Sequence, residues 1–293
     1  MTAQVPVVFR PPSVRVERRR RHTLYFLEFA RSQRTVGIDT EVDMTRVMAH
    51  RAAARADGDR YSIISYLLLA AGQGLARHPE ANATTLAGWP SRWRAPRTAR
   101  FQGVTAKIAL DRLVDGERTV LSALLPGLER SGLTQIQDQL NLYRSPDMSE
   151  HPDFRGPRLL GRLPVLLGRP LFLAALRSPT RRQAVFGTVS VSSLGHRPVD
   201  GFYSTGGTAV TLCLGRVTDR PVVRDGAVVV APVMRLSLTF DHRVIDGGTA
   251  ADLLGEIKQE LEAFDGKGGR TEGVVRGTGQ DHRARRGLAA DQH

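Results

Sequence analysis

The sequence predicts a mixed α/β fold. Apolar and polar residues alternate as in a β-strand in two segments that lie far apart, Thr35–Asp43 and Met234–Asp241. Helix-like segments lie between and after them, and the last has apolar residues at helical spacing: Ala250, Leu254, Ile257, Leu261 and Phe264. With 293 residues and 41% hydrophobic residues, the chain can bury a sizeable core in one large domain.

The first half of the chain contains strands and helices in alternation. The segment Thr35–Asp43 is a predicted strand with one irregularity, at Thr40. Thr45 can cap an Ala-rich helix to about Ala56, and Ser62 can cap a second, apolar helix that should be buried. Two further strands and a helix are expected after these: Val104–Leu110, Thr119–Leu125 and Thr134–Tyr143.

The second half opens with an apolar stretch and then becomes mainly β. Prolines and arginines interrupt Leu159–Leu176, so we expect broken helices there, within an extra apolar segment at about 155–180. Extra helical packing on the domain surface is the favoured interpretation, with a lid over a channel or a membrane-surface contact as alternatives. Strands are expected at Phe186–Ser192 and Ala209–Gly215, and Asp225-Gly226 predicts a two-residue hairpin turn.

Composition excludes several classes of protein. A single cysteine, Cys213, excludes a disulfide framework and fits a reducing cytoplasm, and no His/Cys spacing predicts a metal site. No apolar run is long enough to cross a bilayer, and no secretory signal is expected. The net charge is +13, but residues 1–21 contribute +5 and residues 267–293 contribute +3, so we predict a flexible basic arm and a disordered tail around a domain at 22–266. The charge pattern argues against a nucleic-acid partner.

The segment LSLTFDHRVIDGG, Leu236–Gly248, carries the strongest chemical signal. It places His242 directly after an alternating strand, where a side chain is held in a fixed position. Histidine has a pKa near neutrality, so His242 is a candidate to take a proton from a nucleophile and return it. Asp246 can orient the turn that follows. A capped histidine before a helix is the alternative.

This segment resembles the DHRVxDG signature of the catalytic domain of dihydrolipoamide acyltransferases, the acyltransferase components of 2-oxoacid dehydrogenase complexes. FGTVSVSSLG, Phe186–Gly195, is similar to the family's GTFTISNLG, and RHPEANA, Arg77–Ala83, to its PELNA. TAVTLCLGRV, Thr208–Val217, resembles the strand before its hairpin, and IDTEVDMT its first strand. The resemblance covers about residues 35–264. It implies a two-layer α/β sandwich of the chloramphenicol acetyltransferase type, with a mixed sheet covered by helices.

The resemblance also implies roles for individual residues. His242 falls at the position of the general base, and Ser192 at that of the hydroxyl that stabilises the oxyanion of the tetrahedral intermediate. Asp246 falls at the acidic position, whose role is positioning, and Arg20 or Arg21 is a candidate for its arginine partner. In this family the histidine of one subunit faces the serine of its neighbour, so a homotrimer or an assembly of trimers is implied.

The implied function is acyl transfer between a CoA thioester and a thiol or hydroxyl acceptor, with acyl-CoA as substrate and no metal. The chain upstream of Thr35 is too short for a lipoyl domain or a peripheral-subunit-binding domain, so we expect no covalent lipoyl group on this chain. A separate lipoylated or carrier protein would then supply the acceptor. The alternative is a trimeric scaffold protein with weak turnover, against which the retention of both His242 and Ser192 argues.

Overall fold

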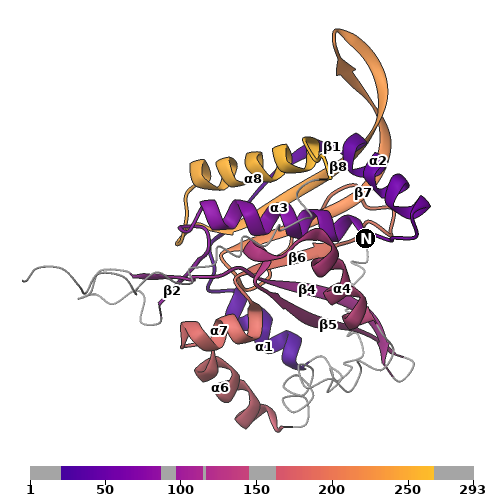
Figure 1. Ribbon diagram of the computed structural model, residues 1–293. Coiled ribbons are helices and arrows are strands. Elements are labelled where there is room, and N and C mark those ends of the chain that lie inside the picture. Colours follow the sequence, from indigo (N-terminus) through magenta and orange to yellow (C-terminus); the bar gives the residue numbers. More distant parts are fainter. Residues whose placement is uncertain (1–20, 87–96, 115–116, 145–162, 267–293) are drawn as a thin grey trace, which may run out of the picture.

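The computed structural model describes residues 21–86, 97–114, 117–144 and 163–266 (Figure 1). The α-helices of this part are α1 (Arg21–Ala30), α2 (Thr45–Ala56), α3 (Ile63–Arg77), α4 (Leu133–Arg144), α6 (Val165–Ala175), α7 (Pro179–Phe186) and α8 (Gly247–Glu262). The strands are β1 (Thr35–Asp43), β2 (Ala83–Thr85), β3 (Thr98–Arg100), β4 (Thr105–Val114), β5 (Glu117–Pro126), β6 (Val189–Ser193), β7 (Val210–Arg224) and β8 (Ala227–Asp241). The predicted tail at 267–293 and all but the last residue of the predicted arm at 1–21 lie outside the described residues.

Six of these strands form one mixed sheet in the order β1-β8-β7-β6-β4-β5. The pairs β1–β8, β7–β8 and β4–β5 are antiparallel, whereas β6 pairs in parallel with both β4 and β7. Strands β2 and β3 form a separate small sheet that the sequence patterns did not predict. The first and last strands of the described chain, β1 and β8, are therefore neighbours in the sheet.

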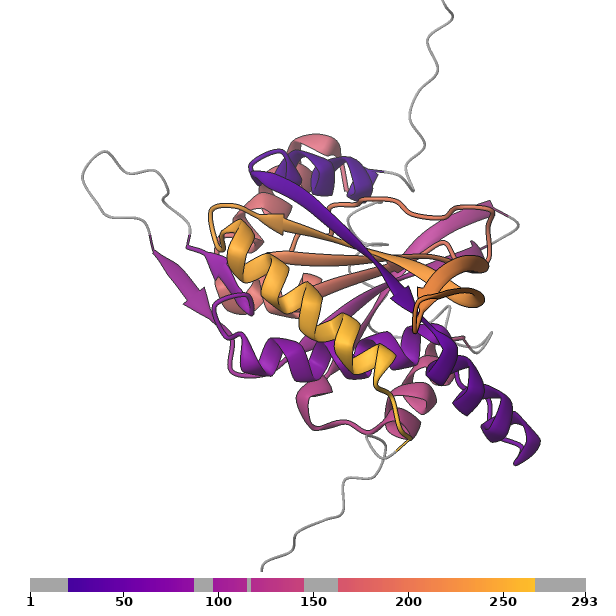
Figure 2. The same ribbon diagram turned by 90° about the horizontal axis from the view of Figure 1, so that it is seen from above.

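Helices α3 and α8 cover one face of this sheet (Figure 2). The sheet residues that face them are apolar and buried, and those in the central strands include Ile108, Val191, Leu212 and Leu238. Ten of the 15 residues of α3 are buried, as its nearly all-round apolar pattern predicted. Together with the helices on the other face, this arrangement confirms the predicted fold class of a mixed sheet covered by helices.

The long hairpin of β7 and β8 confirms the predicted turn. Asp225 and Gly226 connect the two strands with φ values of 53° and 77°, the left-handed region that a tight hairpin turn of this kind requires. Both strands are much longer than predicted, and their outer part projects beyond the sheet (Figure 1). Irregular pairing between Leu214 and Val217 separates the inner part from this projecting part.

Helices α1, α6 and α7 form a second hydrophobic cluster on the opposite side of the molecule from α8 (Figure 1). Tyr25, Phe172, Leu176 and Phe186 are its buried members. Phe186 therefore ends helix α7, so the prediction that a strand begins there was wrong. Gly187 follows with a φ of 65° and lies so close to the Thr105 carbonyl that a side chain would clash, which is why the strand begins only at Val189.

Two other predictions need correction. Pro170 lies inside the continuous helix α6 and does not break it. The N–H that Pro170 lacks would bond to the carbonyl of Leu166, a residue that is exposed, so water can take its place. Residues 159–162 of the predicted broken segment lie outside the described residues.

Thr45 is the first residue of α2 and not its cap, because the Asp43 carboxylate accepts hydrogen bonds from the Thr45 N–H and hydroxyl. Helix α1 had no predicted counterpart. No helix in the described ranges is long and apolar enough to span a membrane.

Candidate active site

His242 directly follows the last residue of β8, and its side chain is exposed. Its backbone N–H donates to the Arg34 carbonyl at 2.8 Å, which ties the turn to the residue before β1. The imidazole lies 5.5 Å from the ring of Phe240, centroid to centroid, so it stands at the end of the sheet face that carries the core. A fixed backbone and an accessible ring are what a proton-transferring histidine needs.

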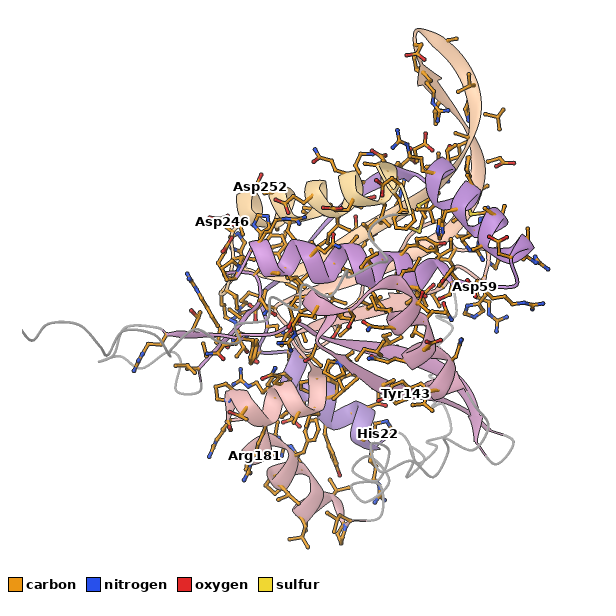
Figure 3. The ribbon with its side chains drawn as sticks, in the orientation of Figure 1. His22, Asp59, Tyr143, Arg181, Asp246 and Asp252 are labelled. Atoms are coloured by element: carbon orange, nitrogen blue, oxygen red, sulfur yellow. The ribbon has the colours of Figure 1, made fainter. Side chains whose placement is uncertain are left out.

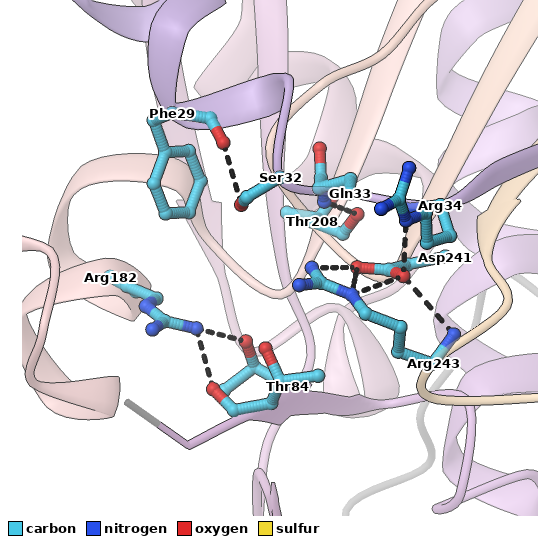
Figure 4. A network of polar contacts seen from close by, with 10 residues as sticks. Phe29, Ser32, Gln33, Arg34, Thr84, Arg182, Thr208, Asp241 and Arg243 are labelled. Carbon is cyan, nitrogen blue, oxygen red and sulfur yellow. Dashed lines mark hydrogen bonds and ion pairs between the residues drawn. The ribbon is translucent and has the colours of Figure 1, made fainter. Parts of the chain in front are cut away.

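Asp241 holds this turn in place, and the sequence analysis gave it no role (Figure 4). Its carboxylate is buried and accepts hydrogen bonds from the backbone N–H groups of Arg34, at 3.3 Å, and Arg243, at 3.1 Å. The Arg243 guanidinium adds bonds at 2.9 Å and 2.5 Å. Burial works to raise the pKa of Asp241, but the hydrogen bonds from Arg243 outweigh it and leave that pKa below its ordinary value. The two residues that flank His242 in sequence, Asp241 and Arg243, therefore form an ion pair with each other, and this pair fixes the position of His242.

Asp246 is the N-cap of α8. Its side chain accepts a hydrogen bond from the Thr249 N–H at 2.9 Å, and this bond holds the pKa of Asp246 below its usual value. Arg21, one of the two candidate partners of Asp246, donates instead to the Leu163 carbonyl at 3.2 Å. Arg20, the other candidate, lies outside the described residues.

Ser192 lies near the end of β6, partly exposed, on the face opposite the buried Val191. Its hydroxyl has no hydrogen-bond partner among the described residues. The neighbouring Ser193 differs, because its hydroxyl accepts a bond from the Gly195 N–H at 3.3 Å where the strand ends. Within β6, Ser192 is therefore the serine whose hydroxyl is open to a ligand, whereas Ser190 is buried and donates to the Gly206 carbonyl.

One chain does not bring Ser192 and His242 together. Ser192 is level with Cys213 of β7, which is level with Ser237 of β8, so His242 lies five residues farther along and two strands away. These steps correspond to ~17 Å along the strands and ~10 Å across them. The Ser192 side chain also lies on the face opposite the core residue Val191, whereas the His242 ring lies beside the core residue Phe240. A catalytic pair of these residues therefore requires a second copy of the chain.

Two other features lie elsewhere in the molecule. A shallow pocket of about 460 Å³ lies between α7 and the β4–β5 edge, and its lining contains none of the three candidate site residues. Lys107, on β4, donates to the Gly206 carbonyl at 2.5 Å and lies over the rings of Phe26 and Phe186. Burial lowers its pKa to about 8. No group of three or more potential metal ligands occurs in the described ranges.

Comparison with known proteins matches the part that contains His242 and Ser192 to one family model and finds relatives of a short stretch of the chain. Residues 178–266 match the family model of the 2-oxoacid dehydrogenases acyltransferase catalytic domain. Over 50 residues, 17% of this chain, the sequence is 54% identical to the dihydrolipoyllysine-residue acetyltransferase component of the pyruvate dehydrogenase complex of Bacillus subtilis. The same component from Staphylococcus aureus is 50% identical over 50 residues. These stretches are 11% and 12% of the relatives' own lengths.

Solved structures extend the likeness to the whole fold. A probable dihydrolipoamide acetyltransferase from Listeria monocytogenes superposes with a TM-score of 0.64 at 18% identity, over 86% of this chain and 95% of that one. The cubic core of the pyruvate dehydrogenase multienzyme complex gives 0.63 at 20% identity, over 89% and 97%. The resemblance inferred from the sequence is therefore confirmed: in residues 178–266 and in its fold, this chain is similar to the catalytic domain of the 2-oxoacid dehydrogenase acyltransferases.

Proposed function

We propose that this chain is an acyltransferase that moves an acyl group between a CoA thioester and a thiol acceptor of the dihydrolipoyl type, or a hydroxyl acceptor. The observation that carries this proposal is that the imidazole of His242 is exposed while its backbone is fixed. The His242 N–H donates to the Arg34 carbonyl, and the Arg34 N–H donates to the Asp241 carboxylate. The curated relatives support the acceptor class, since they are named dihydrolipoyllysine-residue acetyltransferases. A separate lipoylated protein is the proposed source of the acceptor.

His242 acts as the general base in this mechanism. The imidazole takes the proton of the acceptor thiol while the sulfur attacks the carbonyl carbon of the acyl-CoA thioester. The C–S bond to CoA then breaks, and the leaving thiolate takes the proton back from the imidazolium. The base ends the cycle neutral, so no other proton donor or acceptor is needed.

Ser192 of a second copy supplies the oxyanion donor. Its hydroxyl has no other partner in the described part of the chain, so it is free to bind the negative oxygen of the tetrahedral intermediate. The separation of Ser192 from His242 within one chain supports this arrangement between chains, and we propose a homotrimer or an assembly of trimers. Such an assembly would fit the similarity to the cubic core.

Asp246 positions the turn after His242 by capping α8. A solved structure of the Azotobacter vinelandii dihydrolipoamide acetyltransferase, which is 20% identical to this chain, belongs to a study of a serine, a histidine and an asparagine in its catalytic mechanism. That histidine and asparagine are four positions apart, as His242 and Asp246 are. A carboxylate at this position keeps the capping role because Asp and Asn are comparable N-caps.

The test is a transfer assay with the full chain. The protein is incubated with a panel of acyl-CoAs and dihydrolipoamide, and loss of acyl-CoA and formation of acyl-dihydrolipoamide are followed by liquid chromatography with mass detection. The change His242→Ala should lower the transfer rate at least ~100-fold, the lower end of what general-base catalysis contributes. The change His78→Gln, in a histidine bonded to Glu80 and Glu256 at the end of α3, is the matched control. Unchanged transfer in His242→Ala would refute the mechanism, and no transfer by the unmodified protein would favour the scaffold.

A further inference from the structure

Helix α6 exposes a continuous set of apolar side chains. The exposed fractions of Leu166, Leu167 and Leu171 are 88%, 61% and 57%, and Val165 is also exposed. Residues three or four apart are neighbours on a helix surface. Leu167 therefore adjoins Leu171 and the exposed Pro170, and Pro170 adjoins Leu166, so these side chains form one patch, which we call the α6 patch. A patch of large exposed apolar residues in one place marks an interaction surface.

Contacts with α1 hold the α6 patch outward. Gly168 and Phe172 are buried on the opposite side of α6, against Tyr25, with the two rings 6.2 Å apart. The Arg169 guanidinium forms two hydrogen bonds with the Glu28 carboxylate, one of 2.7 Å. The helix therefore cannot turn its leucines inward without losing a ring contact and an ion pair. In Figure 1, α6 lies at the edge of the molecule farthest from α8.

The charge around the α6 patch is strongly positive. The described segments 21–31 and 163–186, which include α1, α6 and α7, contain six arginines and one glutamate, a net charge of +5. Helix α8 carries four carboxylates and one lysine, a net charge of −3. In Figure 3, Asp246 and Asp252 lie at α8, and Arg181 lies at the opposite side of the molecule. The α6 patch thus lies in a basic part of the molecule.

Apolar side chains on a basic surface fit the boundary of an anionic bilayer, where leucines enter the acyl region and arginines meet lipid phosphates. A second copy of the chain offers no such complement. Of the other exposed apolar residues in the described ranges, Leu24 and Leu27 lie on α1, within the same basic segments. The hairpin tip with Val223, Val228 and Val230 has charged neighbours, two arginines and two aspartates, that cancel. The acidic helix α8 has no comparable exposed apolar side chains.

We propose that the α6 patch is a membrane-contact surface that binds the face of a bilayer containing anionic lipids, with Leu166, Leu167 and Leu171 entering the boundary between headgroups and acyl chains. The helix lies in the plane of the surface and does not span it, since α6 has only 11 residues. Apolar burial and charge attraction act together, and the strength of membrane binding by such a helix grows with both. This surface is separate from His242 and would hold the protein at a membrane whatever its acyl substrate.

The experiment is vesicle flotation with the full chain, using vesicles of phosphatidylcholine alone and of phosphatidylcholine mixed with phosphatidylglycerol. We expect the protein to float with the mixed vesicles and to be released as salt is added, because the charge attraction is screened. A triple variant, Leu166→Ser, Leu167→Ser and Leu171→Ser, should bind at least ~10-fold more weakly. The control removes three exposed valines elsewhere, Val223→Ser, Val228→Ser and Val230→Ser, and should bind like the unmodified protein.

Three results would overturn the proposal. The first is no flotation of the unmodified protein with mixed vesicles at low salt. The second is equal binding of the α6 triple variant, which would assign the binding to another part of the chain. The third is a change of oligomeric state in that variant, by sedimentation velocity, with vesicle binding intact, which would make the α6 patch a contact between copies. Circular dichroism checks the fold, and Leu166→Ser alone is the milder variant.

Discussion

The change Asp241→Asn tests whether the buried ion pair with Arg243 fixes the turn that carries His242. The Asp241 carboxylate is 3% exposed and accepts four N–H groups, two from backbone and two from the Arg243 guanidinium. An asparagine has one acceptor oxygen, and its NH₂ group would face the guanidinium as a second donor. Arg243, itself largely buried, would keep its charge without a counter-charge.

Removing one partner of a buried pair costs about 3–5 kcal/mol, a large part of the stability of an ordinary domain. We expect Asp241→Asn to lower the free energy of unfolding by ~3 kcal/mol, measured by urea denaturation at neutral pH. The matched control is Asp246→Asn, a carboxylate in the same turn that is exposed and whose replacement keeps an N-cap. That variant should lose less than ~0.5 kcal/mol, because Asp and Asn cap helices about equally well.

The pH dependence gives a second measurement. The pKa of Asp241 lies below its unfolded value of about 3.9, so its stabilisation is fully present above that pH and is lost as the pH falls through the folded pKa. The difference between the unmodified protein and Asp241→Asn should therefore shrink below about pH 4. A double variant with Arg243→Met should recover part of the loss, because the unpaired charge is gone. A loss under ~1 kcal/mol in Asp241→Asn, with no recovery in the double variant, would refute the reasoning.

Three other predictions concern single side chains. Ser192→Ala should lower kcat by ~10²–10³-fold with little change in KM for acyl-CoA, whereas Ser193→Ala should change kcat little. The opposite result would show that Ser193, and not Ser192, is the oxyanion donor. Because the pKa of Lys107 is lowered to about 8, the unfolded chain binds more protons than the folded one between about pH 8 and 10.5. Stability should therefore rise by ~1 kcal/mol between about pH 8 and 9.5, and Lys107→Met, followed by urea denaturation, should lose that rise. Asp246→Ala should lower the free energy of unfolding by ~1 kcal/mol through loss of the bond to the Thr249 N–H, and an unchanged value would mean that the cap contributes nothing.

Local patterns in the sequence were enough to predict many elements of this fold. The strand Thr35–Asp43 has the predicted bounds, and the Asp225-Gly226 turn lies where the dipeptide indicated. The apolar residues of the alternating segment Met234–Asp241 include Leu236, Leu238 and Phe240, and these three lie in the core. These features depend on neighbours a few residues apart, so they are present in the sequence itself. Phe186 shows the limit, because its apolar run fits a strand, but its ring packs with α1 and α6 as the end of a helix.

The sequence by itself determined the candidate residues of the site: His242 and Asp246 through the segment Leu236–Gly248, and Ser192 through the segment Phe186–Gly195. Only the tertiary structure decided that Ser192 and His242 lie far apart within one chain, two strands from each other. It also brought Arg34, distant in sequence, against Asp241 and turned the leucines of α6 outward. Strand register and the side of a helix that is covered depend on contacts between distant segments, and these contacts leave no periodic signal in either segment alone.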